Sequence, residues 1–514
     1  MDVGKTIRSD TDVSRTRGSQ RALTLAKVLS AALVCYFVAA FLYVSISRMG
    51  YIFTLEWLEG ASLIQIQRLL SGLPLYVRPT FDYVPLIYSP LYFYVAALFA
   101  RIIGFGFLPL RLVSFLATLG CVGMIYLIVR KYTQDGLVSL LAAGSFLALY
   151  KVSDSWFDLA RVDMLAMFLT LLAVYLAQGR AAWRLVLAGV ALALAPLAKQ
   201  TYWILFVPVL VYAAFLQKRR VLYMLLTALL VSLAAHLLLN QLSGGWYSFF
   251  VYSAGFGQGS SVFAGGLRHF FTAYWIDSVL KVVPVLFVLF VAYFIVKIRS
   301  IWSMLGLLSL AAGAIVLSWA GILNKGGYNN VLIPSYVVFL ICAWLLIADV
   351  MKDAASSDLV RTGLLLLFSV QMALLLYPIA AQIPTQDDYR AGQVILQDIR
   401  SQPGDVYIPF DNYLTLYAGK QPFAGFGSLG DLNQLPGGIA KAEWNRINSQ
   451  LREMIKTKQF SLIILDENAD WGSAERYYQS YYEPAPIKYR GDTFFPVAGW
   501  QIRPGTKYTP VTSH

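Results

Sequence analysis

The sequence predicts an α-helical polytopic membrane protein with a small α/β domain at its C-terminal end. Of its 514 residues, 58% are hydrophobic and 13% are charged, whereas an ordinary soluble protein carries about 25% charged residues. Apolar runs of helical length recur between residues 28 and 380, and more polar sequence follows them. A water-soluble enzyme is therefore excluded, and the 15% of aromatic residues excludes a disordered chain.

The basic residues predict how the chain is oriented in the membrane. The net charge is +13, and short basic clusters flank the apolar runs, at Arg130-Lys131 and within 180–184, 218–220, 297–299 and 352–361. Such clusters lie on the cytoplasmic side of membrane proteins. We expect a cytoplasmic N-terminal tail over residues 1–27, and we assign the positive charge to orientation and not to binding of nucleic acid.

About 11 transmembrane helices are predicted between residues 28 and 380. The first runs from Val28 to about Ile46, and the others lie near 110–129, 137–150, 163–179, 185–198, 202–216, 221–240, 279–296, 301–320, 330–349 and 361–380. A crossing by residues 88–104 would put the Arg130-Lys131 cluster outside. Since that segment is also rich in aromatic residues, we expect it to lie in the membrane interface.

This arrangement predicts three external loops and an external C-terminal domain. The loops are 48–109, which contains interfacial helices, 151–163, and 241–278. Residues 381–514 are expected to form the α/β domain, with strands at Val406–Phe410 and Phe460–Leu465. The expected location is a bacterial inner membrane, with the C-terminal domain in the periplasm.

Two groups of acidic residues fall on the same external side. Glu56 and Glu59 are three residues apart in the first loop and share one face of a helical turn. Asp158 and Asp163 lie in the second loop. Each group alone is explained by ordinary solvated charge, but two such groups in an acid-poor chain favour a shared site. Its carboxylates would act as a general base, and orient it or hold a divalent cation.

The motifs resemble those of the integral-membrane GT-C glycosyltransferases. The acidic first loop is followed by Gly72-Leu73-Pro74-Leu75-Tyr76 and Tyr88-Ser89-Pro90-Leu91-Tyr92, and an Arg161-x-Asp163 motif opens a later span. This order is similar, over about residues 28–240, to bacterial glycosyltransferase family 39, which includes protein O-mannosyltransferases and aminoarabinose transferases. Members of that family carry adjacent Asp-Glu in the first loop. Here Leu58 precedes Glu59, so the base is either Glu59, which the spacing to Gly72 favours, or Glu56.

The resemblance implies an inverting transfer of a sugar from a polyprenyl-phosphate donor to a hydroxyl of a lipid, glycan or protein. Glu59 or Glu56 would be the base, and Asp163 and Asp158 would form the second acidic element. Three external cations are expected to bind the donor phosphate: Arg161, Lys199 and Lys325. Each is otherwise explained as a helix-end charge.

Sugar contacts and a cation site complete the expected machinery. Tyr88, Tyr92 and Asn329 are expected to contact the acceptor or the sugar. If the reaction uses a divalent cation (Mg, Mn or Zn), Glu56, Asp163 and His269 are candidate ligands, although a lone loop histidine is more often a surface residue.

Two other classes of function compete with this interpretation. A transporter or flippase predicts ionisable residues near the middle of the membrane, whereas the acids here cluster at its external side. A ligase or polymerase of surface polysaccharide is expected to depend on external Arg and His residues instead of an acidic first loop.

Overall fold

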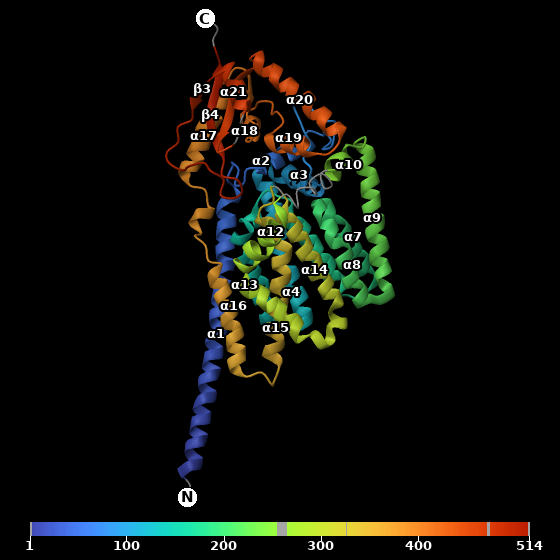
Figure 1. Cartoon of the computed structure of the whole chain (residues 1–514), viewed down its shortest axis with the longest axis vertical. Coiled ribbons are helices and arrows are strands. Elements are labelled where there is room, and N and C mark those ends of the chain that lie inside the picture. Colours follow the sequence, from blue (N-terminus) through green and yellow to red (C-terminus); the bar gives the residue numbers. More distant parts are fainter. Residues whose placement is uncertain (1–2, 254–264, 325, 470–472, 512–514) are drawn as a thin grey trace.

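The computed structural model describes residues 3–253, 265–324, 326–469 and 473–511. A bundle of helices forms the lower part of the molecule in Figure 1, and an α/β layer covers its upper end. The helices α2 (Glu59–Leu70) and α3 (Leu91–Ile103) of the first external loop lie between these two parts. The N-terminal end of α1 (Val3–Met49) extends below the bundle, so residues 3–27 continue the first helix.

Each predicted span contains a helix of the bundle. After α1 the chain forms, in order, α4 (Phe107–Thr133), α5 (Gly136–Ser145), α6 (Asp163–Ala177), α7 (Ala182–Ala198), α8 (Trp203–Gln217), α9 (Val221–Leu242), α13 (Pro284–Val296), α14 (Ile301–Leu323), α15 (Ile333–Lys352) and α16 (Asp358–Leu374). Among the described residues, five helical stretches are long and apolar enough to cross a membrane, or six if a pair bent by 98° counts as one span. The chain is thus a polytopic helical membrane protein, while the number of 11 crossings stays a prediction.

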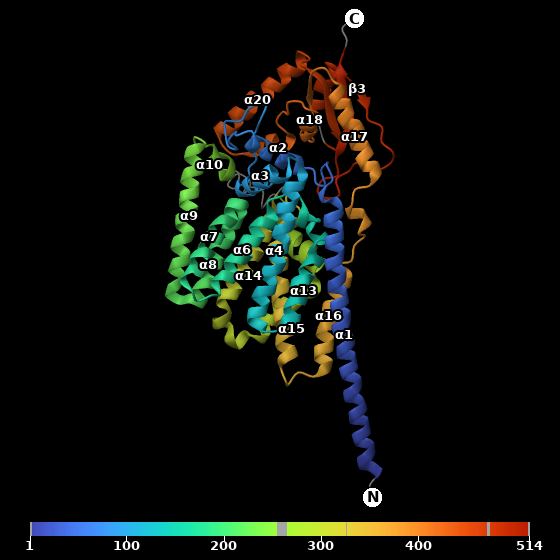
Figure 2. The ribbon, with the colours of Figure 1, turned by 180° about the vertical axis from the view of Figure 1, so that it is seen from behind.

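The helices at the centre and at the edge of the bundle differ in burial. In α15 every residue from Ile333 to Ala348 is buried, as expected for a helix that is apolar on all sides. In α9, which lies at the edge of the bundle in Figure 2, only Met224, Ala228 and Ser232 are buried. Most of the leucines of α9 are exposed, where lipid would contact them.

The C-terminal segment folds around a four-stranded mixed sheet of order β1-β2-β4-β3. The strands β1 (Asp405–Tyr407) and β2 (Phe460–Glu467) are parallel, and β4 (Arg503–Pro510) is antiparallel to β2 and to β3 (Tyr482–Pro486). Its helices are α17 (Gln386–Ser401), α18 (Tyr413–Tyr417), α19 (Phe426–Gln434), α20 (Gly438–Lys456) and α21 (Ser473–Gln479). Both predicted strands are present.

The first external loop and the C-terminal segment share one hydrophobic core. Phe81 of the loop stacks on Phe423 with ring centroids 5.0 Å apart, and Phe53 packs edge-on against Phe494 at 5.2 Å. A parallel β-bridge joins Glu56 to Ala498. The loop therefore forms one folded unit with the C-terminal segment, because both bury their apolar faces in the same core.

The shorter helices of the external loops complete the cover of the bundle. The second loop forms the short turns η1 (Phe146–Leu149), η2 (Lys151–Ser153) and η3 (Trp156–Asp158). The described parts of the third loop form α10 (Trp246–Val251), α12 (Gly266–Phe271) and the π-helix η7 (Thr272–Leu280).

We predict that the contact between α7 and α9 depends on Gly189. A Cβ atom at this position would lie 2.5 Å from the Met224 carbonyl oxygen and 2.9 Å from Thr227 Cβ. Gly189→Ala should destabilise the bundle by about 1–3 kcal/mol through overpacking, measured by thermal unfolding in detergent. The control is Gly123→Ala in α4, where a Cβ meets nothing within 4 Å, so it should be neutral or stabilising. Equal effects of the two variants would contradict the prediction.

Candidate active site

The second external loop turns sharply below the first. Asp154 and Ser155 both adopt left-handed backbone conformations, with φ of 55° and 59°. Such a conformation is costly for a residue other than glycine and persists only when the surroundings hold it. The Asp154 carboxylate accepts hydrogen bonds from the backbone N–H and the side-chain Nδ2 of Asn329, at 2.7 and 3.1 Å. This turn directs residues 156–163 under the first loop.

Glu59 is buried in a fully paired ionic contact. Its carboxylate accepts hydrogen bonds from Arg111 at 3.1 and 2.7 Å, and from the backbone N–H groups of Leu55 and Ala160 at 2.7 and 2.6 Å. Burial by itself would raise the pKa of Glu59, but Arg111 and these hydrogen bonds hold that pKa below its ordinary value. This geometry suits a structural carboxylate that links the two external loops to α4.

Glu56 has a different environment although it is equally buried. Its nearest cation is Arg161, with 3.7 Å between Oε2 and Nη1, and Oε2 has no hydrogen-bond partner among the described residues. Burial raises the pKa of the Glu56 carboxyl to about 7, although Arg161 lowers it. A carboxyl with these properties takes up and releases protons near neutral pH, as a general base requires.

Arg161 is the central cation of this part of the molecule. Its Nη2 donates to the Tyr88 hydroxyl at 2.8 Å, and its guanidinium lies between the rings of Tyr88 and Trp156, at 5.1 and 5.3 Å from their centroids. The Nε atom is buried and has no hydrogen-bond partner in the described chain. Arg161 therefore retains donors that an anionic group at this position would satisfy.

Asp163 begins α6 and is held by three polar side chains. Lys199 Nζ lies 2.5 Å from its Oδ1, Asn330 Nδ2 donates to the same oxygen at 2.8 Å, and Trp156 Nε1 donates to Oδ2 at 2.9 Å. Lys199 stands between α7 and the turn η4 (Gln200–Tyr202), and Asn330 lies in η9 (Asn329–Leu332). Asp163 thus joins three segments that are far apart in the sequence.

Asp158 belongs to a separate ion pair at the end of α1. Its carboxylate accepts from Arg48 Nε at 2.9 Å and from the Tyr150 hydroxyl at 3.3 Å. Arg48 also donates to the backbone oxygens of Ser155 and Gln382. The carboxylate fixes the second loop to the first helix.

The remaining candidate residues divide into those near Arg161 and those elsewhere. Tyr88 is half-buried against Arg161, whereas Tyr92 is fully buried and donates its hydroxyl proton to the Leu110 carbonyl at 2.8 Å. Asn329 is occupied by Asp154. His269 is exposed on α12, and Lys325 lies outside the described residues.

The candidate cation ligands do not fit a metal ion. In the part of the chain that the structure describes, no three His, Cys, Asp or Glu side chains are grouped as a metal site requires. Both oxygens of Asp163 are taken by Lys199, Asn330 and Trp156. We derive no step of a reaction through a metal.

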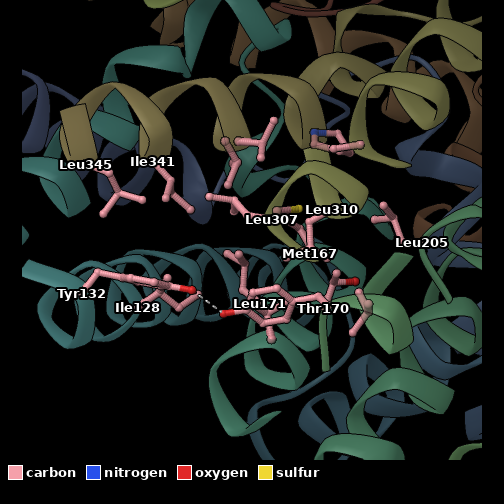
Figure 3. A pocket seen from close by; sticks show the side chains of 17 residues that line it. Ile128, Tyr132, Met167, Thr170, Leu171, Leu205, Leu307, Leu310, Ile341 and Leu345 are labelled. Carbon is pink, nitrogen blue, oxygen red and sulfur yellow. Dashed lines mark hydrogen bonds between the residues drawn. The ribbon is translucent and has the colours of Figure 1, made fainter. Parts of the chain in front are cut away.

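An apolar groove begins directly below Asp163. Seventeen side chains line it, from α4, α6, α8, α14 and α15, and its volume is about 630 Å³, including the part that is open to the surroundings (Figure 3). Met167 of the lining follows Asp163 by one helical turn, and Pro334 follows Asn330 in the same way. At the far end Tyr132 and Tyr212 share a hydrogen bond of 3.0 Å between their hydroxyls. Two residues of the polar cluster, Asp163 and Asn330, therefore lie one turn before residues that line the groove.

Sequence reasoning missed four residues of this region. Arg48 and Arg111 lie at the ends of predicted spans, on the side opposite to the basic clusters. Arg161 was selected because it is a cation on that side, and the same criterion would have found these two residues. Asn330, not its neighbour Asn329, contacts Asp163. Asp431, on α19 of the C-terminal segment, lies in electrostatic range of Arg161 and Tyr88, and no motif marks it.

Known proteins resemble this chain in a segment of its sequence and in its whole fold. A family model described as dolichyl-phosphate-mannose-protein mannosyltransferase matches residues 85–247, about a third of the chain. No curated protein matches the sequence. The structure of ArnT from Cupriavidus metallidurans bound to undecaprenyl phosphate matches with a TM-score of 0.57 and 12% identity, covering 93% of this chain and 98% of that one.

Two further structures agree with this match. ArnT from the same organism in the apo state gives a TM-score of 0.55 at 13% identity, over 93% of this chain and 98% of that one. The apo oligosaccharyltransferase from Archaeoglobus fulgidus gives 0.51 at 13% identity, over 87% of this chain and 69% of that one.

These comparisons show the fold of this chain. It has the architecture of the GT-C membrane glycosyltransferases, which confirms the resemblance that the motifs predict. The segment that the mannosyltransferase model matches includes Tyr88, Arg161, Asp163 and Lys199.

We predict that Glu59 is required for stability and not only for activity. Glu59→Gln leaves the buried Arg111 guanidinium without its counter-charge, which should cost about 3–5 kcal/mol of the free energy of unfolding. Thermal unfolding in detergent measures this loss. The matched control is Glu56→Gln, which replaces a carboxyl with a pKa of about 7 and no close ion pair, so this variant should unfold near the wild-type temperature. A Glu59→Gln protein of wild-type stability would contradict the assignment.

Proposed function

We propose that this protein is an inverting glycosyltransferase that moves a sugar from a polyprenyl-phosphate donor to a hydroxyl acceptor on the external face of the membrane. One observation carries the proposal. A buried carboxyl with a pKa raised to about 7 faces an incompletely paired guanidinium, and an apolar groove lies among the helices of the same bundle.

Glu56 is the proposed base. The acceptor hydroxyl transfers its proton to Glu56, and its oxygen forms a bond to the anomeric carbon of the donor sugar. The bond from that carbon to the phosphate oxygen breaks, and the electron pair leaves with the polyprenyl phosphate. Because the acceptor attacks opposite the leaving group, the anomeric configuration inverts. Glu59 is less suited to this step, since four hydrogen bonds already occupy its carboxylate.

Arg161 is the proposed partner of the leaving phosphate. Its buried Nε has no hydrogen-bond partner in the described chain, and its contact to Glu56 is longer than a hydrogen bond. A charge-assisted hydrogen bond from this group would stabilise the negative charge that develops on the phosphate oxygen. Lys199 is 2.5 Å from Asp163 and would add positive charge at the mouth of the groove.

The groove suits the hydrocarbon chain of such a donor. Its lining is almost entirely apolar, with Thr170, Tyr132 and Tyr212 as the hydroxyl-bearing members. Burial of each methylene group contributes about 0.8 kcal/mol to binding. The phosphate would then lie beside Arg161 and Lys199. The similar ArnT structure is bound to undecaprenyl phosphate, which supports a lipid donor of this class. The inner-membrane location and the external site are parts of the same proposal.

We predict that Glu56→Gln lowers the rate of transfer by about a hundred- to ten-thousandfold, the usual contribution of a general base. The assay offers purified protein radiolabelled undecaprenyl-phosphate sugars and a panel of hydroxyl acceptors, and measures release of undecaprenyl phosphate. Because the pKa of Glu56 is about 7, kcat/KM of the wild type should fall as the pH decreases through 7, as the base becomes protonated.

The control for this experiment is Glu483→Gln, which changes an exposed carboxylate on β3. It should keep the wild-type rate and pH profile. A Glu56→Gln enzyme with unaltered turnover would remove Glu56 from the role of base. Movement of the labelled lipid across a vesicle membrane without sugar transfer would indicate a transporter instead.

We predict that the groove sets the affinity for the lipid part of the donor. Leu310→Trp on α14 should fill part of the groove and raise KM for an undecaprenyl-phosphate sugar about tenfold, equivalent to about two buried methylene groups. A geranyl-phosphate sugar, whose chain is shorter, should be affected less. The control Leu308→Trp changes the outward face of the same helix. Equal effects on both donors, or of both variants, would contradict a role of the groove in binding the chain.

A further inference from the structure

The C-terminal segment reaches the proposed catalytic residues directly. Gly499, in the loop before β4, has a φ of +72°, and a Cβ atom there would lie 3.0 Å from Glu56 Cγ and 3.1 Å from its Oε1. The backbone N–H of Ala498 donates to the Leu55 carbonyl at 3.1 Å. The wall on one side of the Glu56 carboxyl is therefore backbone of the C-terminal segment.

A second contact fixes α19 against the first loop. A Cβ atom at Gly427 would lie 2.4 Å from Leu58 Cδ1. The backbone of α19 therefore packs directly on Leu58, which precedes Glu59 in the first loop. Phe410 stacks on Phe426 at the start of α19 with centroids 4.4 Å apart, and Phe410 also packs against Trp57 at 5.9 Å. These contacts hold α19 in a defined position over the site.

Asp431 lies on the second turn of α19 and faces the same guanidinium as Glu56. Its carboxyl interacts electrostatically with Arg161 and with the Tyr88 hydroxyl. No described Lys, Arg or His nitrogen lies within ion-pair distance of Asp431, and its carboxylate has no hydrogen bond in the described chain. The side chain is only half-buried, so its oxygens remain accessible. A half-buried carboxylate that interacts with an arginine without pairing to it can still form a hydrogen bond with a ligand group.

We propose that Asp431 recognises a hydroxyl group of the sugar that is transferred, so that the C-terminal segment determines which donors the enzyme accepts. This inference rests on the proposed function. Burial raises the pKa of the Asp431 carboxyl to about 7, although Arg161 lowers it, so both its ionised and its protonated form are present at neutral pH. A sugar hydroxyl can donate to the ionised form or accept from the protonated form, and it can also accept a hydrogen bond from Arg161 or Tyr88. A phosphate oxygen only accepts, so it can pair with the protonated form alone.

The charge balance favours the sugar over the phosphate as the partner of Asp431. Arg161 already faces Glu56 on one side and Asp431 on the other. The ionised form of Asp431 would repel an additional anion beside it, whereas a neutral hydroxyl satisfies the carboxylate without adding charge. Arg161 would thus contact the phosphate through Nε and the sugar through the side that faces Asp431.

Donors that lack single hydroxyl groups test this inference. Purified wild type, Asp431→Ala and Asp431→Asn are offered undecaprenyl-phosphate mannose, glucose and arabinose, and then the deoxy analogues, at each ring position, of the donor with the highest turnover. A hydrogen bond to a charged group corresponds to a loss of about 10- to 100-fold in kcat/KM. Wild type should show this loss with one analogue, and Asp431→Ala should turn over that analogue and its parent donor equally.

The control is Asp492→Asn, which removes an exposed carboxylate from the same segment. It should discriminate against the analogue as the wild type does. A purely structural role of Asp431 would lower turnover of all donors by one common factor and keep the discrimination, which would overturn the inference. Both Asp431 variants are compared with the wild type at equal folded fraction, which is measured by thermal unfolding. If Asp431→Ala does not fold, the isosteric Asp431→Asn variant is used for the comparison of donors.

The outcome separates this inference from the proposed function. If the wild type transfers sugar and the Asp431 variants keep its discrimination, the inference fails and the proposed function stands. If the wild type transfers sugar from none of the donors to any acceptor, the proposed function fails and the inference fails with it.

Discussion

The architecture of this protein depends on charged side chains that are buried where the helix bundle meets the α/β layer. Arg48 with Asp158, Arg111 with Glu59, and Lys199 with Asp163 form close ion pairs with nearly no exposed surface. An unpaired charge in such a position costs several kcal/mol, so each partner requires the other. Since the partners come from different segments, the pairs fix α1, α4 and α7 to the two acidic external loops.

The same constraint explains which carboxyl we propose as the base. Three of the cations are satisfied by close carboxylate contacts, whereas Arg161 lies 3.7 Å from Glu56 and keeps an unpartnered Nε in the described chain. The close ion pairs fix the positions of the two acidic loops. These fixed positions keep the Glu56 carboxyl and the Arg161 guanidinium 3.7 Å apart. Both kinds of contact join a basic and an acidic side chain. The three contacts that stabilise the fold are close ion pairs, whereas the Arg161–Glu56 contact, which we propose for chemistry, is longer.

The external layer is best understood as one body. The first loop buries its aromatic residues against the sheet of the C-terminal segment, as the Phe81–Phe423 and Phe53–Phe494 contacts illustrate. A division of the chain at residue 381 separates parts that share a hydrophobic core. The proposed base is consequently bounded by membrane-bundle residues on one side and by Gly499 on the other.

The sequence by itself determined the membrane class, the helix positions and the segments that hold the site, because hydrophobicity, length and charge distribution are local properties of the chain. It identified Glu56, Arg161, Asp163 and Lys199 by the cost of charge at a membrane surface. Only the tertiary structure decided that, of the two glutamates of the first loop, Arg111 occupies Glu59 and Glu56 is the one with a raised pKa. It also brought Asp431 to Arg161. The pKa of a buried acid depends on which cation packs against it, and those cations and acids come from segments that only folding brings together.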